Sequence, residues 1–177
     1  MMSNDKKPAP DRISEKPYGN AGGMIHISRG KYIGQEEVKD RLYVLQVKYS
    51  RCIFSHETAL FLHGFTAAPE VITVTCPQGY NVTSLKDEKV IIKKVIPANY
   101  SSDIEECSTA FGNPVRVYSI ERTLCDILRG SGTELSVISA AMKKYVAMEN
   151  RKPEKLLEIA DRLRVRPKVL RYLEVLL

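Results

Sequence analysis

The chain has 177 residues, which is enough for one domain of ordinary size with a small appendage. Hydrophobic residues make up 44% of the sequence, so a core can form and a fully disordered chain is excluded. The formal net charge of +6 permits a nucleic-acid or acidic protein partner but does not demonstrate one.

The N-terminal residues 1–23 are rich in Pro, Gly, Lys and Asp, which predicts a disordered or loosely attached arm. Residues 24–34 read as two short strands around the turn Ser28-Arg29-Gly30, so we expect a β-ribbon with a basic tip. The remaining residues, 35–177, are expected to form the main α+β domain.

Hydrophobic spacing predicts a helix over residues 35–48 and a short buried strand before Ser55. A second helix is expected to begin at Ser55, because serine suits the N-cap, and to end at Gly64. Extended segments follow at 71–75, 89–95 and 114–119, and we expect a polar, exposed loop over 96–109.

The last third is predicted to be helical. Ser119 is expected to cap a helix that stops at Gly130, and a second helix is expected over 134–148. Pro153 and Pro167 each suit the first turn of a further helix. Strands before helices predict an α+β fold, with a small mixed sheet followed by a C-terminal helical bundle.

The stretch "FSHETALFLHGF", residues 54–65, invites a catalytic interpretation because Ser55, His56 and Glu57 are adjacent. Successive helical positions point about 100° apart, so these side chains cannot converge as a triad. His56 and His63 share a helix face but lie about 10 Å apart, too far to bind one metal ion. We therefore predict no catalytic, metal or cofactor site, and interpret the stretch as a helix start.

A metal-dependent nuclease is a remote alternative. Glu121 and Asp126 lie on one predicted helix, but about 140° apart around its axis, which is not the spacing of a metal pair. Glu121 and Arg122 are better explained as a helix start that matches the helix dipole. The nuclease hypothesis predicts Mg²⁺-dependent cleavage that requires Asp126, whereas our expectation is a protein that is not an enzyme and has no small-molecule substrate.

The cysteines and the apolar stretches indicate the compartment. Cys52, Cys76, Cys107 and Cys125 form no C-x-x-C pair, so neither a zinc ribbon nor a dithiol motif is expected. No apolar stretch approaches the roughly 20 residues that span a bilayer, and no signal segment follows the first basic residues. We expect a cytoplasmic protein without a membrane partner.

Basic side chains accumulate near the C-terminus, where residues 151–177 hold eight basic and four acidic residues. A solvated face explains this charge as well as a contact surface does. The side chains that we expect to be exposed and to contact a partner are Arg116, Arg122, Lys143, Lys144, Arg164, Arg166 and Arg171. Arg29 and Lys31, at the ribbon tip, are the further candidates for contact with DNA.

Several segments, taken in order, resemble the AbiEi family, the antitoxins of bacterial abortive-infection toxin–antitoxin pairs. The segments are "SRGKYI", "FSHETALFLHGF", "TVTCPQGYN", "FGNPVRVYSIERTLCDILR" and "LRYLEVLL". The likeness covers roughly residues 24–177, and its most specific part is 111–129. The resemblance implies an α/β antitoxin domain, which is not an enzyme and counters a nucleotidyltransferase-like toxin encoded beside it, directly or by competing for its targets.

The same resemblance implies an N-terminal winged helix that represses the shared operon by binding operator repeats. A winged helix needs about 60 residues, including a recognition helix for the major groove. Only 33 residues precede Gly34, and the ribbon at 24–34 matches only the wing. We therefore expect an antitoxin domain with a wing but no recognition helix. A DNA-binding autoregulator, which would use the wing tip and the basic C-terminal helices, is the alternative.

Overall fold

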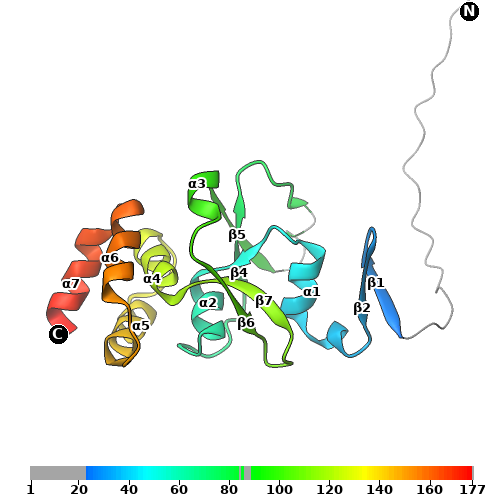
Figure 1. Cartoon of the computed structure of the whole chain (residues 1–177), viewed down its shortest axis with the longest axis horizontal. Coiled ribbons are helices and arrows are strands. Elements are labelled where there is room, and N and C mark those ends of the chain that lie inside the picture. Colours follow the sequence, from blue (N-terminus) through cyan, green and yellow to red (C-terminus); the bar gives the residue numbers. More distant parts are fainter. Residues whose placement is uncertain (1–22, 84, 86–88, 177) are drawn as a thin grey trace, which may run out of the picture.

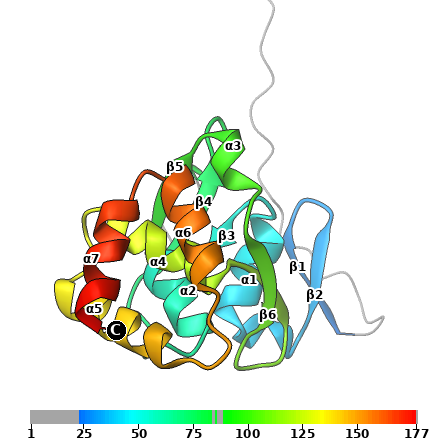
Figure 2. The same ribbon diagram turned by 60° about the vertical axis from the view of Figure 1, so that its left-hand side comes forward.

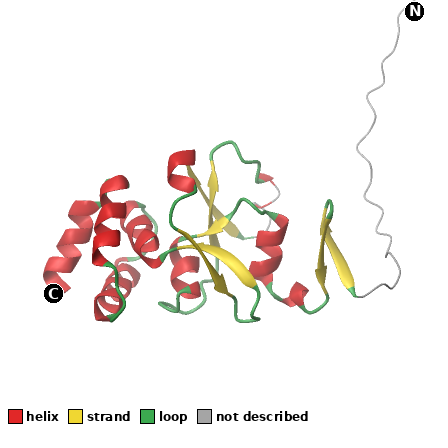
Figure 3. Ribbon diagram, in the orientation of Figure 1, coloured by secondary structure: helices red, strands yellow, loops and turns green. Residues whose placement is uncertain are grey.

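A computed structural model describes residues 23–83, 85 and 89–176 (Figure 1). The predicted arm lies outside the described residues, except for Gly23. A β-hairpin, a sheet with its covering helices and a group of C-terminal helices follow one another along the long axis of the molecule (Figures 1 and 3). The α+β class and the C-terminal helices predicted from the sequence are confirmed.

The predicted ribbon forms as β1 (Met24–Ser28) and β2 (Lys31–Gly34), which pair antiparallel. The predicted helix over 35–48, in contrast, is divided into a 3-10 turn, η1 (Glu37–Lys39), and α1 (Arg41–Lys48). Asp40 lies between them, and its carboxylate accepts the N–H of Tyr43 at 3.1 Å. The prediction of one continuous helix is wrong at this point because Asp40 caps α1.

The five-stranded sheet has the order β5-β4-β3-β7-β6, and it is mixed. Strand β4 runs parallel to β5 and β3 runs parallel to β7, whereas β3–β4 and β6–β7 are antiparallel. The strands are β3 (Ile53–Phe54), β4 (Ile72–Pro77), β5 (Val90–Val95), β6 (Ile104–Ser108) and β7 (Pro114–Tyr118).

The polar loop predicted over 96–109 is wrong, because this segment forms α3 (Pro97–Tyr100) and the edge strand β6. Strand β6 pairs with β7 on one side only. Its residues Glu105 and Glu106 are exposed. Charged side chains protect an edge strand from pairing with other chains, and they remove the hydrophobic alternation that identifies a strand in sequence.

The apolar core of the sheet includes Leu45 of α1, Phe54, Val74 and Val117, all of which are buried. Helix α2 (His56–Leu62) packs against β4 and ends near Gly64, as the sequence predicts. Gly64 has a φ of +73°, and the N–H of Phe65 donates to the carbonyl oxygen of Leu60 at 2.7 Å. This is the usual way in which glycine closes a helix.

Four helices complete the molecule: α4 (Ile120–Arg129), α5 (Leu135–Ala147), α6 (Pro153–Arg162) and α7 (Arg166–Leu176). As predicted, the Ser119 hydroxyl caps α4 by accepting the N–H of Arg122 at 3.3 Å. Helix α4 contacts α2 on one side and α5, α6 and α7 on others (Figure 2). Residues 121–128 of α4 are therefore all buried.

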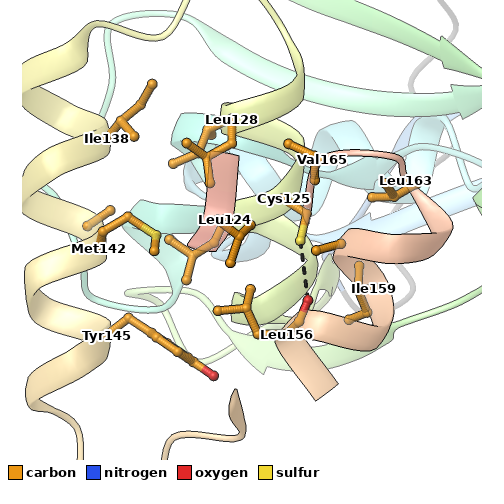
Figure 4. Close-up of a cluster of buried hydrophobic side chains, with 14 of the residues drawn as sticks. Leu124, Cys125, Leu128, Ile138, Met142, Tyr145, Leu156, Ile159, Leu163 and Val165 are labelled. Carbon is orange, nitrogen blue, oxygen red and sulfur yellow. Dashed lines mark hydrogen bonds between the residues drawn. The ribbon is translucent and has the colours of Figure 1, made fainter. Parts of the chain in front are cut away.

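Apolar side chains from α4, α5 and α6 meet in one cluster (Figure 4). Leu124 and Leu128 of α4 face Met142 of α5 and Leu156 of α6, and all four are buried. Burying an aliphatic or thioether side chain of this size contributes about 1.5–3 kcal/mol to the free energy of unfolding. The cluster therefore fixes α4 against the C-terminal helices.

Candidate functional site

The stretch 54–65 begins at the junction between the sheet and α4. Ser55 occupies the N-cap position of α2, but its hydroxyl makes no capping hydrogen bond. It instead accepts the hydroxyl proton of Thr75 at 2.9 Å and lies 3.1 Å from Nδ1 of His56. Ser55 therefore lies at the predicted N-cap position, but it makes no capping hydrogen bond to the N–H groups of α2. Its hydroxyl bonds instead to Thr75 of β4.

His56 has an unusual backbone conformation for its residue type, with a φ of +52°. Its side chain is only 9% exposed, and burial lowers its pKa below the ordinary 6.5, although the carboxylate of Asp126 opposes that shift. The imidazole is therefore neutral at pH 7. The hydroxyl of Ser55 accepts from Thr75 and also shares a hydrogen bond with Nδ1 of His56, which holds the ring in place.

The other polar residues of the stretch contact different elements. Nε2 of His63 lies 2.7 Å from the carbonyl oxygen of Tyr118, which joins the end of α2 to the end of β7. The carboxylate of Glu57 accepts the hydroxyl proton of Thr133, in the loop after α4. The side chains of Ser55, Glu57 and His63 thus join α2 to three separate parts of the chain, which are β4, the loop after α4 and the end of β7.

A polar pocket of about 330 Å³ lies between the sheet and α4, and His56 is part of its wall. Strand β4 contributes Thr75, β5 contributes Lys93, α3 contributes Asn99, and α4 contributes Asp126 and Arg129. We call this cavity the junction pocket. Its walls come from segments that are far apart in the sequence, so only the folded chain assembles it.

Arg122 lies directly behind the wall of the junction pocket and is fully buried. Its Nε donates to the carboxylate of Asp126 at 3.0 Å, and Nη1 donates to the carbonyl oxygen of Asn99 at 2.9 Å. The guanidinium carbon lies 4.5 Å from the centre of the Tyr118 ring, and a carboxylate oxygen of Asp103 is 3.8 Å from Nη1. Within the described residues, Nη2 has no hydrogen-bond partner.

The prediction that Arg122 is an exposed contact residue is therefore wrong. An arginine in the first turn of an amphipathic helix would usually face solvent. Helix α4 has no solvent face along residues 121–128, because α2 and the C-terminal helices pack around it. The charge of Arg122 is instead neutralised by Asp126, inside the molecule.

The cations of the junction pocket differ in what they bind. The ammonium of Lys94 donates to the carbonyl oxygen of Tyr80, so this side chain is already engaged. Lys93 is half-buried and Arg129 is exposed. Within the described ranges, neither Lys93 nor Arg129 forms a hydrogen bond or an ion pair. These two cations are the ones that remain available to a ligand.

At the N-terminal end, the predicted contact residues have two different roles. Arg29 is exposed at the tip of the β1–β2 hairpin. The ammonium of Lys31 donates to the carbonyl oxygens of Val47 and Lys48, at 2.7 and 3.0 Å, and so holds the hairpin to the end of α1. Arg116 is half-buried in β7, and its guanidinium donates to the carbonyl oxygen of Ser50.

The remaining predicted contact residues are spread over the C-terminal helices. Lys143 is exposed on α5, whereas the ammonium of its neighbour Lys144 donates to the carbonyl oxygen of Gly64. Arg164 is exposed between α6 and α7, Arg166 pairs with Asp161, and Arg171 is exposed on α7. The structure distributes the nine predicted residues over the hairpin, β7 and the C-terminal helices, so they do not form one site.

A second pocket, of about 480 Å³ and mostly apolar, lies between α4, α5 and α7. Its apolar wall includes Leu128, Leu135, Tyr172 and Val175. The ammonium of Lys168 lies at its edge and donates to the carbonyl oxygen of Leu128 at 2.8 Å, which places this cation at the end of α4. Residues of three helices build this pocket without a converging set of polar groups.

The carboxylates named for the nuclease alternative have structural partners. Asp126 is paired with Arg122, as described above. Glu121 is buried, and its carboxylate adds to burial in raising the pKa of the Tyr145 hydroxyl. In the part of the chain that the structure describes, no group of three His, Cys, Asp or Glu side chains could hold a metal ion.

Two free thiols form a pair that spacing in the sequence does not reveal. Cys52 and Cys76 are fully buried, and their sulfur atoms lie 2.8 Å apart. The hydrogen bond between them, together with burial, raises the pKa of the Cys52 thiol. Cys52 precedes β3 and Cys76 belongs to β4, and antiparallel pairing of these strands brings the two together.

Sequence reasoning missed the junction pocket, although one signal for it was present. Lys93 interrupts a β-branched run in β5, and a charged residue in the middle of such a run indicates a face that is not pure core. Asn99 fell in a segment predicted to be a loop.

Comparison of the sequence with models of known protein families and with curated proteins finds no match. Across the described residues, every helix is too short or too polar to cross a membrane.

Proposed function

We propose that this chain is the antitoxin of a bacterial toxin–antitoxin pair of the AbiEi kind, and that it counters a nucleotidyltransferase-like toxin. The observation that carries this proposal is where two of the resembling segments lie, one of them the most specific. Residues 54–65 and 111–129 are far apart in sequence, yet α2 packs directly on α4 and His63 contacts the carbonyl oxygen of Tyr118 at 2.7 Å. The two segments thus pack against each other, and we call this contact between α2 and α4 the joint.

A joint of this kind supports a binding role. Buried polar contacts, such as the ion pair of Arg122 with Asp126, hold the surface around it in one shape. A preorganised surface loses less conformational entropy on binding a partner protein. Exposed cations on α5, which packs against α4, suit an acidic patch on a toxin or the phosphates of the toxin's target; Lys143 is one of them.

Co-expression tests the proposal. Cells that express the nucleotidyltransferase-like toxin encoded beside this gene should regain growth when the chain is co-expressed. If the toxin contacts α5, Lys143→Glu should weaken this rescue, because it reverses a charge that the fold does not use. The matched control is Arg29→Glu, which makes the same charge change on the distant hairpin and should leave rescue intact. A folded chain that gives no rescue would contradict the proposal.

The DNA-binding autoregulator is the second candidate, and the projecting hairpin favours it. Figure 1 shows β1 and β2 at the end of the molecule, away from the C-terminal helices. Arg29 is exposed at the tip, and the rings of His26 and Tyr32 lie 5.0 Å apart on one face of the hairpin. In the same pair of variants, loss of operator repression in Arg29→Glu with rescue retained would assign a separate DNA-binding role to the hairpin.

A further inference from the structure

We propose that the junction pocket binds the phosphate group of a small phosphorylated molecule, such as a nucleotide. The inference goes beyond the antitoxin role and does not depend on it. Three features of the pocket carry the inference: the balance of charge in its wall, the incomplete hydrogen bonding of Arg122 behind that wall, and the neutral polar side chains that line the cavity.

The charge balance favours an anion. Lys93 and Arg129 contribute cations from β5 and from the end of α4. Among the described residues that line the pocket, Asp126 is the only acidic one, and its carboxylate already accepts a hydrogen bond from Arg122 at 3.0 Å. The charge of Asp126 is therefore offset from behind, whereas Lys93 and Arg129 form no ion pair with any residue that the structure describes. A doubly charged phosphate matches the two remaining cations.

Arg122 adds a second, independent indication. It is fully buried, and its Nη2 has no hydrogen-bond partner in the described part of the chain. Leaving a buried cationic group incompletely bonded is costly, and such groups often mark a functional site. Arg122 contacts Asn99 and Asp126, which both line the pocket. Arg122 therefore fixes two residues of the pocket wall and cancels the charge of Asp126 from behind.

Neutral polar groups complete the site. The hydroxyls of Thr75 and Ser55 and Nδ1 of His56 form a chain of hydrogen bonds at the pocket wall. The wall includes His56, and burial keeps the pKa of its imidazole below 6.5, so this ring is neutral at pH 7. The side-chain amide of Asn99, which also lines the pocket, carries two donor hydrogens. Amide and hydroxyl groups of this kind can donate hydrogen bonds to a phosphate.

The size of the cavity restricts the ligand. About 330 Å³ lies at the lower end of the range of roughly 300–1,000 Å³ for small-molecule pockets. A phosphate and the neighbouring part of a small molecule fit this volume, and a folded macromolecule does not. The terminal phosphate of an oligonucleotide has the same chemistry as a nucleotide phosphate, so the experiment must separate these two sources.

Calorimetric titration of the full chain tests the proposal with four probes. These are inorganic phosphate, ATP without Mg²⁺, a 5′-phosphorylated oligonucleotide and the same oligonucleotide with a 5′-hydroxyl. We expect ATP to bind, and we expect Lys93→Gln and Arg129→Gln each to weaken binding about tenfold or more, as is typical for loss of a charge-assisted hydrogen bond. Lys143→Gln is the matched control, with the same charge change on an exposed α5 position outside the pocket.

Nuclear magnetic resonance keeps the test informative if a variant folds poorly. On adding ATP to the unmodified chain, the backbone amide resonances of Lys93, Asn99 and Arg129 should shift more than that of Lys143. No binding of any probe at millimolar concentration would overturn the proposal, as would equal weakening by Lys143→Gln. Preference for the 5′-phosphorylated over the 5′-hydroxyl oligonucleotide, with weaker ATP binding, would overturn the small-molecule source. Rescue from toxicity is a separate readout, so either proposal can fail alone.

Discussion

The two halves of the molecule are held together by different means. In the sheet half, residues 41–118, polar side chains join elements that are far apart in sequence. The side chain of Gln46 in α1 donates to the carbonyl oxygen of Arg116 at 2.9 Å and accepts the N–H of the same residue. Just before α1, Asp40 accepts hydrogen bonds from Thr109 and Asn113.

The helical half, residues 120–176, uses apolar contacts almost throughout. One buried cluster holds side chains from α5 and α6, namely Ile138, Met142, Leu156 and Ile159 (Figure 4). A polar contact within it, from the thiol of Cys125 to the carbonyl oxygen of Leu156, is long at 3.8 Å. Helices satisfy their own backbone hydrogen bonds, whereas strands depend on partners elsewhere in the chain. The comparison teaches that polar anchors are placed where the register between distant segments must be fixed.

Arg122 lies where the two halves meet, and its removal should have the largest effect. Arg122→Met leaves the carboxylate of Asp126 buried without its cation, and we expect the free energy of unfolding to fall by about 3–5 kcal/mol. Urea unfolding followed by circular dichroism measures the change. The control is Arg162→Met, because Arg162 pairs with Asp103 at a more exposed position and should cost less than about 1 kcal/mol. Similar losses in both variants would contradict a special role for the junction.

Acid should act on the junction through His56. Burial lowers its folded-state pKa below the ordinary 6.5, so below pH 6.5 the unfolded chain binds a proton that the folded chain excludes. The free energy of unfolding should therefore fall as the pH drops below 6.5, by no more than about 1.4 kcal/mol per pH unit for one proton.

His56→Asn removes this titration and keeps a residue type that tolerates a φ of +52°. Urea unfolding at pH 7.5 and pH 5.5 should therefore show a smaller pH difference in the variant than in the unmodified chain. Equal pH differences in the two proteins would assign the acid sensitivity to other groups.

The smallest predicted effect compares helix ends in the two halves. Helix α2 closes with Gly64, whereas α6 closes in the same way with Arg164, whose φ is +58°. In both, the next residue donates back to the helix, as Val165 does to the carbonyl oxygen of Ala160 at 2.8 Å. Arg164→Gly relieves the steric strain, and we expect the free energy of unfolding to rise by about 0.5–1 kcal/mol.

Thermal unfolding of two variants isolates this strain. Arg164→Ala removes the same charge but keeps the Cβ atom, so it should not gain stability as Arg164→Gly does. If the alanine variant gains as much as the glycine variant, the gain comes from the lost charge and the strain argument fails.

The sequence predicted local features better than distant contacts. The cap at Ser119, the stop at Gly130 and the helix starts at Pro153 and Pro167 depend on neighbouring residues, and the structure confirms each of them. The cap that Asp40 makes with Tyr43 is local and was missed, whereas its other partners, Thr109 and Asn113, are about 70 positions away. For the same reason, no local pattern could reveal that α4 is surrounded and that Arg122 is buried.

The junction pocket follows the same rule. Its residues come from α2, β4, β5, α3 and α4. The sequence of any two of these elements does not indicate where the other three lie in the fold. Lys93 gave a local signal as a charge within a β-branched run, but it could not indicate which side chains would face it. Two of the walls, α2 and α4, belong to the segments 54–65 and 111–129 that were singled out in the sequence. Nothing in those segments indicated that a cavity lies beside them.

Helix α4 packs against both halves of the molecule. This limits which segments can be exchanged between two related chains. A chimera that joins the sheet of one relative to the C-terminal helices of another must choose a parent for α4. Whichever parent supplies it, one face of α4 meets unfamiliar neighbours: Leu60 of α2 on one side, or Met142 and Leu156 on the other. A working exchange must therefore carry α4 together with its contact residues from both sides.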